Sequence, residues 1–222
     1  MRHVATKEPD RERAREIVER GTILRALVGS TVHGLSNPGT DDRDEMAVCI
    51  EPPEYLLGLR TFEHYVARTQ AEGRPSGPGD LDLVVYGLRK YWRLALKGSP
   101  TALLLLFAQG EMVLERAPLG ERLQALAPAI VCRSPNRPRL SRLPRLPAQG
   151  ASGRITLPVP EPQRSLLMQI RRGELPLAET LAALDRETWA LNALVDDPNL
   201  PDSPDRDSVD RFLVEAYREH WA

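Results

Sequence analysis

Two apolar runs flank a short segment of turn and acidic residues, and this pattern constrains the fold more than any other feature of the chain. Residues 22–28 are rich in apolar and β-branched side chains and end at Gly29-Ser30. A run of this kind, bounded by Gly and Ser, predicts a buried strand that delivers a turn. Residues 45–50 form a second apolar run, closed by Pro52-Pro53, and predict a second strand. The acidic segment therefore lies between two strands.

Asp42 and Asp44 stand directly before the second predicted strand. Side chains in an extended strand alternate between faces, so these two carboxylates point the same way and Arg43 points to the other side. Mg²⁺ is commonly held by one or two carboxylates together with substrate phosphates. The pair therefore predicts a metal-assisted site for phosphoryl groups, with a solvated turn as the alternative. Asp41 is predicted to cap backbone N–H groups of the turn.

Further along the chain, acidic residues stand at the entrance of a third predicted strand, over residues 80–86. Asp82 is predicted to lie beside the carboxylate pair, and Asp80, which shares its strand face, is the alternative. Apolar residues at helical spacing predict helices over residues 10–20, 87–96, 101–107, 163–172, 177–194 and 207–221. Strands and helices in this order indicate an α/β fold. Trp92, Trp189 and Trp221 fall on apolar helical faces and are predicted to pack in the core.

The composition favours an ordinary globular protein and disfavours several classes of partner. With 222 residues, 41% hydrophobic and 27% charged, the chain is long enough for one sizeable domain, or for one domain with an appendage. Its 30 Lys and Arg nearly balance 31 Asp and Glu, so no overall positive field indicates a long nucleic-acid duplex, whereas a nucleotide or a short RNA end still fits. Cys49 and Cys132 do not indicate a disulfide framework, so we expect a cytoplasmic protein. The charged N-terminal segment and the absence of a long apolar run lead us to expect neither a secretory signal peptide nor a membrane partner.

A Pro/Arg-rich segment interrupts the second half of the chain. Most of residues 134–162 show no apolar period, so a packed element is not expected there. The arginines of this segment also form a basic strip able to hold phosphates, but without interleaved aromatic residues a linker is the simpler interpretation. We therefore expect a core over residues 1–132, a linker or loop over residues 133–162, and a C-terminal helical region over residues 163–222.

The spacing of these motifs resembles a known superfamily. Gly29-Ser30 precedes Asp42-Arg43-Asp44 with eleven residues between Ser30 and Asp42, and this pattern resembles the DNA polymerase β nucleotidyltransferases. Together with the run from Asp82 to Lys90 and Leu96-Lys-Gly-Ser-Pro-Thr101, it is more specifically similar to a bacterial and phage group of predicted nucleotidyltransferases, some of them associated with RNA ligases. The resemblance covers roughly residues 22–110.

The resemblance implies both a fold and a chemistry. The implied fold is α/β (α+β), a mixed sheet flanked by helices and followed by a C-terminal helical region. The implied reaction transfers an NMP from an NTP to a hydroxyl acceptor, which is an RNA end, a small molecule or a protein, with two Mg²⁺ or Mn²⁺ ions. The implied metal-binding and catalytic residues are Asp42, Asp44 and Asp82. The implied nucleotide-binding residues are Gly29, Ser30 and Thr31.

Some residues and functions keep more than one interpretation. Lys90, together with Arg93 one helical turn further on, is a candidate for binding a triphosphate or an RNA backbone, with a solvated helix face as the alternative. His33 is either a phosphate contact or a structural hydrogen-bonding residue. Because Pro/Arg-rich sequence occupies residues 134–153, where the resembled group carries a basic helical segment, a catalytically weak or inactive nucleotide-binding module that acts through a partner is the alternative function. A purely structural helical protein would leave the Gly-Ser and Asp-x-Asp spacing to coincidence.

Overall fold

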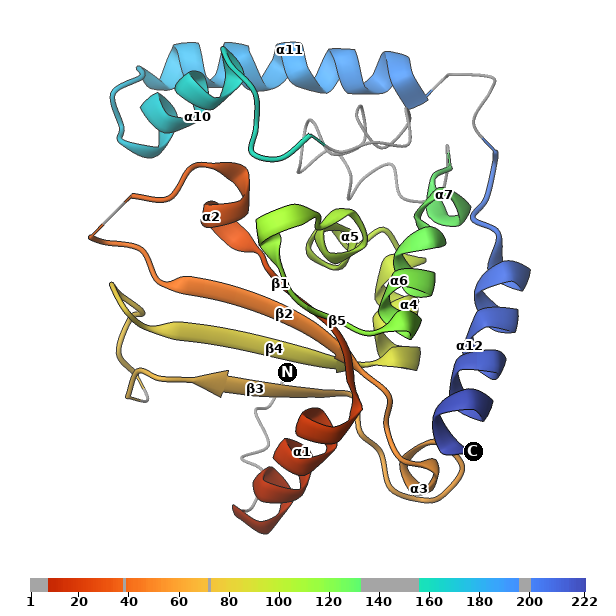
Figure 1. The fold of residues 1–222 in the computed structure, drawn as a ribbon. Coiled ribbons are helices and arrows are strands. Elements are labelled where there is room, and N and C mark those ends of the chain that lie inside the picture. Colours follow the sequence, from red (N-terminus) through yellow and green to blue (C-terminus); the bar gives the residue numbers. More distant parts are fainter. Residues whose placement is uncertain (1–7, 38, 72, 133–155, 196–200) are drawn as a thin grey trace.

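The computed structural model describes residues 8–37, 39–71, 73–132, 156–195 and 201–222, and its centre is a five-stranded mixed sheet in the order β3-β4-β2-β1-β5 (Figure 1). β2 and β4 run parallel, and the other neighbouring strands run antiparallel. The strands are β1 (Thr22–Leu27), β2 (Arg43–Cys49), β3 (His64–Arg68), β4 (Leu81–Gly87) and β5 (Val113–Arg116). The predicted mixed sheet flanked by helices is therefore confirmed.

The three strands predicted from sequence are β1, β2 and β4, which occupy the middle of the sheet. The two edge strands, β3 and β5, were not predicted. β3 alternates between exposed and half-buried residues over only five positions, and β5 has four residues of which three are exposed. Short edge strands bury little apolar surface, so their apolar pattern is weak.

Helices surround the sheet, and the apolar spacing predicted six of them. The helical elements are α1 (Glu8–Gly21), α2 (Gly29–His33), α3 (Pro53–Leu56), α4 (Leu88–Ala95), α5 (Pro100–Phe107), the 3₁₀ helix η1 (Gly110–Met112), α6 (Pro118–Ala125), α7 (Ala127–Ile130), α10 (Gln163–Arg171), α11 (Leu177–Val195) and α12 (Arg206–Trp221). The apolar spacing predicted α1, α4, α5, α10, α11 and α12, all of which are present, but not α2, α3, η1, α6 and α7. No helix of the described residues is long and apolar enough to cross a membrane.

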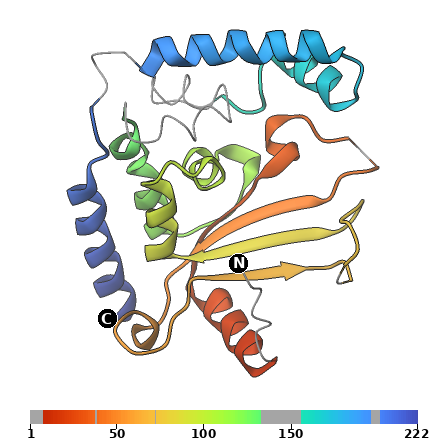
Figure 2. The same ribbon diagram turned by 180° about the vertical axis from the view of Figure 1, so that it is seen from behind.

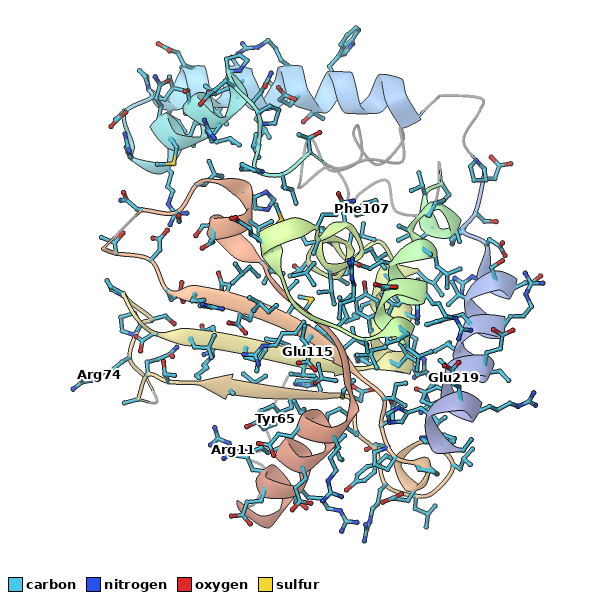
Figure 3. The ribbon with its side chains drawn as sticks, in the orientation of Figure 1. Arg11, Tyr65, Arg74, Phe107, Glu115 and Glu219 are labelled. Carbon is cyan, nitrogen blue, oxygen red and sulfur yellow. The ribbon has the colours of Figure 1, made fainter. Side chains whose placement is uncertain are left out.

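The sheet separates two hydrophobic cores, because alternate residues of its strands point to opposite faces. Met46 and Val48 of β2 lie in the larger core with residues of α4, α5, α6 and α12. Ala47 and Cys49, on the other face, pack with Ile17 of α1 in the smaller core. Tyr65 of β3 joins this smaller core, and Figure 3 shows it on the side of the strand that faces α1. The alternation in β2 thus fixes which face of the sheet each helix covers.

Helix α12 is part of the larger core, although it lies at the far end of the chain. Its residues Val209, Phe212, Ala216 and Tyr217 are buried, and α12 lies beside α4 and α6 in both views (Figures 1 and 2). The backbone N–H of Arg89, in the first turn of α4, donates a hydrogen bond to the hydroxyl oxygen of Tyr217. The three-part division of the chain stays a prediction, and residues 133–155 of the expected linker lie outside the described residues.

The three tryptophans divide between core and surface. Trp92 is 1% exposed, and Trp221 packs against the larger core, as predicted. The prediction for Trp189 is wrong, because 76% of this residue is exposed on α11. Leu181 and Leu184 of the same helix are about half exposed as well. Apolar spacing shows that a helix has an apolar face but does not show whether another element covers that face.

Candidate active site

Three carboxylates meet at the beginning of the two parallel strands. In the pairing of β2 with β4, Asp44 stands opposite Asp82, and Asp42 precedes Asp44 by two residues and so lies on the same face. One oxygen from each of Asp42, Asp44 and Asp82 lies within 4.8 Å of the others, and all three residues are half-buried. The structure therefore brings together the three residues that the sequence predicted as metal ligands.

Asp80, the alternative to Asp82, has a different role. Its carboxylate accepts hydrogen bonds from the hydroxyl of Thr69 and from the backbone N–H of Gly77, each at 3.0 Å. Both donors belong to the connection between β3 and β4, so Asp80 closes that turn. The register of β4 against β2 decides between the two acids, because it places Asp82 next to Asp44.

The carboxylate cluster is electrostatically unfavourable without a cation. Burial raises the pKa of Asp44, and the charges of Asp42, Asp82 and Asp41 raise it further. A divalent cation removes this repulsion, and the donor set fits such an ion, since Mg²⁺ and Mn²⁺ prefer carboxylate and phosphate oxygens. Three carboxylates within 4.8 Å of one another are a suitable donor set for such an ion.

Gly29 lies directly against this cluster. Its φ is +70°, in the left-handed region that favours glycine. A Cβ atom at this position would overlap the carboxylate of Asp44, with Cγ only 2.8 Å away. No other residue therefore fits here without displacing a carboxylate. Close approach of the backbone is what the sequence predicts for the Gly-Ser turn.

Ser30 and Thr31 follow Gly29 in the short helix α2, and Thr31 is exposed. The hydroxyl of Ser30 donates to Asp41 Oδ2 at 3.1 Å. The backbone N–H of Asn37 donates to the same oxygen at 2.8 Å, so Asp41 caps the turn as predicted. This backbone hydrogen bond is the largest influence that lowers the pKa of Asp41. Asp41 is therefore a charged carboxylate that holds the loop between α2 and β2.

Asp82 receives donors from residues that the sequence did not reveal. Gln70 Nε2 donates to Oδ1 at 2.9 Å, and the hydroxyl of Ser76 donates to Oδ2 at 3.0 Å. The guanidinium of Arg68 lies 3.5 Å from Oδ1. These donors fix the orientation of the carboxylate, as outer-shell groups do for metal ligands. The alternation over residues 64–68 was the available signal for β3, but the position of Arg68 opposite Asp82 depends on the register of β3 against β4.

Lys90 is the predicted site residue that the structure does not bring to the cluster. Asp82 is near the start of β4 and Lys90 follows its end, so about five residues at about 3.3 Å each separate them along the sheet. The ammonium of Lys90 pairs with Glu63 at 2.8 Å. The structure therefore places Lys90 beyond the end of β4 that is far from the cluster, and its contact with a triphosphate stays a prediction.

His33 lies at the end of α2 and is partly covered. Burial lowers the pKa of its imidazole, which favours the neutral ring. Its backbone carbonyl accepts a hydrogen bond from the N–H of Val159 at 3.1 Å. The contact that the structure gives His33 is thus a backbone contact to the segment before α10.

Comparison with known protein families gives a match to the first part of the chain. Residues 1–135 match the family described as RlaP, RNA repair pathway DNA polymerase beta family. The match includes all five strands and every predicted site residue. Comparisons with curated proteins and with solved structures found no match.

Proposed function

The chain belongs to the RNA repair pathway DNA polymerase beta family, and we propose that it is a nucleotidyltransferase that moves an NMP from an NTP to a hydroxyl acceptor. The observation that carries the proposal is a set of three carboxylates within 4.8 Å of one another. They lie beside a turn at Gly29, where there is no room for a Cβ atom. A cluster of this kind suits the divalent cations on which phosphoryl chemistry depends. We further propose that two Mg²⁺ or Mn²⁺ ions are needed.

Each part of the site has a role in the proposed reaction. Asp42, Asp44 and Asp82 would hold the cations, which supply neutralisation of the phosphate charge and a lower pKa of the attacking hydroxyl. The hydroxyl oxygen forms a bond to the α-phosphorus, and the bond from that phosphorus to the bridging oxygen breaks, so that pyrophosphate leaves. Asp82, oriented by its donors, is placed to take the proton of the hydroxyl. Gly29 and Ser30 would contact the phosphates of the nucleotide through the backbone, while the hydroxyl of Ser30, which donates to Asp41, holds the turn in place.

We propose an RNA end as the acceptor, with a small molecule or a protein as the other candidates. The support is the description of the family, which names an RNA repair pathway. The near balance of acidic and basic residues also fits a short end better than a long duplex. A cytoplasmic location is part of the same proposal, because NTPs and RNA ends are both available there.

The test is label transfer from each of the four α-labelled NTPs, with Mg²⁺ or Mn²⁺ and with an RNA oligonucleotide that ends in a 3′-hydroxyl. We expect transfer by the wild-type chain and none by Asp42→Asn/Asp44→Asn. Asp185→Asn, an exposed acid of α11 outside the cluster, is the matched control and is expected to behave as the wild type. An RNA with a blocked 3′ end shows whether the terminal hydroxyl is the acceptor.

The outcomes separate the candidate functions. Transfer that depends on Asp42 and Asp44 supports the enzyme. Metal-dependent NTP binding would favour the nucleotide-binding module if no NMP is transferred, either to an added acceptor or to the protein itself. If the chain shows neither NTP binding nor transfer, both candidate functions are overturned.

A further inference from the structure

The segment before and within α10 packs against the C-terminal end of α2, the short helix that begins with Gly29 and Ser30. The two elements lie side by side in both views, with α10 next to α2 (Figures 1 and 2). The N–H of Val159 donates to the carbonyl of His33 at 3.1 Å. Gly34 ends α2 with a φ of +70°, and a Cβ atom there would lie 2.8 Å from Pro158 Cβ. This segment lies outside the residues that match the family, yet it covers the end of the helix that carries Ser30.

An ion pair joins α10 to the loop between α2 and β2. Arg171 Nη2 lies 2.8 Å from both carboxylate oxygens of Asp41, a residue 130 positions away in the sequence. The side chain of Asp41 is only 12% exposed, whereas that of Arg171 is 40% exposed. The carboxylate is thus largely covered, and its charge is compensated by a group from the C-terminal half of the chain. Pairs in such surroundings are stronger than fully exposed ones.

Asp41 transmits this contact toward the carboxylate cluster. Its Oδ2 also accepts hydrogen bonds from Ser30 Oγ and from the N–H of Asn37. One carboxylate therefore connects three segments of the chain: α10, the loop before β2, and the first residue after Gly29. Gly29 is in contact with Asp44, so a shift of this turn moves the backbone that borders the metal-binding oxygens.

We propose that Arg171 is a positioning residue for nucleotidyl transfer, because it fixes Asp41 and through it the hydroxyl of Ser30 and the Gly29-Ser30 turn. The inference rests on the proposed function and deepens it by making the C-terminal region part of the active site. Without Arg171, Asp41 keeps only the donors of its own loop and turn, and the turn is free to adopt other arrangements. The NTP then loses a preorganised contact for its phosphates.

The test compares Arg171→Ala with Arg172→Ala, its neighbour on the same helix end. Arg172 lies 3.9 Å from Glu174 and is about half exposed, so it controls for loss of one positive charge near the site. We expect Arg171→Ala to raise KM for the NTP about tenfold or more, the size of one lost charge-assisted contact, with a smaller effect on kcat. Arg171→Lys, which keeps a charged donor, is expected to recover most of the loss. Arg172→Ala is expected to change neither parameter.

A double-mutant cycle separates positioning from a general effect on the fold. Asp41→Asn and Arg171→Ala remove the same contact, so the double variant is expected to be little worse than the more damaging single variant. Additive losses, an unchanged KM in Arg171→Ala, or equal losses in Arg172→Ala would overturn the proposal. Thermal unfolding of each variant identifies a loss that comes only from instability, which would also overturn it.

Binding of Mg²⁺ with a non-hydrolysable NTP analogue distinguishes failure of this proposal from failure of the proposed function. If the wild-type chain binds the analogue but does not transfer, the transferase proposal fails, and weaker binding by Arg171→Ala still supports the positioning role. If the wild type binds and Arg171→Ala binds equally well, the positioning role is refuted. If the wild type neither binds nor transfers, both proposals fail together.

Discussion

Replacing Asp44 with Asn is expected to stabilise the metal-free protein while removing its response to metal. Asp44 carries the raised pKa of the cluster, with burial as the first cause and the charges of Asp42 and Asp82 as the next. Two unit charges at 4.8 Å, the upper limit of the separation between the ligand oxygens, repel by about 0.9 kcal/mol at the dielectric constant of water. Two such neighbours, reduced by salt screening, give about 1 kcal/mol in total.

For a chain of this length, about 1 kcal/mol corresponds to an increase of about 2–4 °C in Tm. The assay is thermal unfolding of the wild type and Asp44→Asn, first in EDTA and then with Mg²⁺ in large excess. In the wild type, a ligand at about 100 times its Kd adds about 2.7 kcal/mol of stability. Asp44→Asn is expected to unfold at a higher temperature in EDTA and to gain little from Mg²⁺.

Two results would refute this reasoning about Asp44. If Asp44→Asn is less stable than the wild type in EDTA, the carboxylate of Asp44 makes favourable contacts rather than unfavourable ones. A variant that still gains the full stabilisation from Mg²⁺ would show that the metal binds elsewhere. Asp185→Asn, on α11, is the control for loss of an acid outside the cluster and is expected to leave both temperatures unchanged.

Three further predictions follow from single contacts of the site and core. Gly29→Ala is expected to abolish transfer and to lower the free energy of unfolding by about 1–3 kcal/mol, because its Cβ overlaps a carboxylate at a positive φ; label transfer and urea unfolding measure the two effects. Gln70→Ala and Ser76→Ala each remove a donor to Asp82 and are expected to lower kcat about tenfold or more with unchanged circular dichroism, and an unchanged kcat would contradict the orienting role. Burial raises the pKa of Glu51, so the folded state binds a proton on this carboxylate more tightly than the unfolded state does. The free energy of unfolding therefore falls as pH rises from about 4.5 through the raised pKa. Glu51→Gln is expected to remove this fall, as measured by urea unfolding between pH 4.5 and pH 8.

The central part of the fold was predictable because its strands are buried and strongly apolar. Residues 22–28 and 45–50 carry few polar side chains, and β1 and β2 lie close to these ranges. Each of the predicted helices has a structural counterpart, since apolar spacing at 3.6 residues persists over several turns. β3 and β5 escaped prediction because edge strands of four or five residues leave little periodic signal.

The carboxylate cluster was predictable up to the choice between Asp80 and Asp82. Alternation along a strand places Asp42 and Asp44 on one face, but it also places Asp80 and Asp82 together. The choice depends on the pairing of β4 with β2, a contact between residues 38 positions apart that no local pattern encodes. The distance of Lys90 from the cluster was not predictable for the same reason, because helical spacing gives its face on α4 and not the end of the sheet at which α4 lies.

The donors around the cluster were not predictable from sequence. Gln70 and Ser76 belong to a connection rich in Gly and Pro, and their contacts depend on how β3 and β4 pair. The pair of Arg171 with Asp41 joins residues 130 positions apart, and the sequence does not distinguish Arg171 from Arg164 of the same helix or from Arg172, which follows it. Only the packing of α10 on α2 selects Arg171.

If this cluster supports metal-dependent transfer of an NMP, the amount of NMP joined to RNA must equal the amount of pyrophosphate released. The measurement follows α-labelled NMP joined to the RNA 3′ end and pyrophosphate released in the same reaction, for the wild type and for Asp42→Asn/Asp44→Asn. We expect one pyrophosphate for each NMP joined, both dependent on Mg²⁺ or Mn²⁺ and both absent in the double variant. Transfer that persists in the double variant, or pyrophosphate release that persists in EDTA, would contradict this role of the cluster.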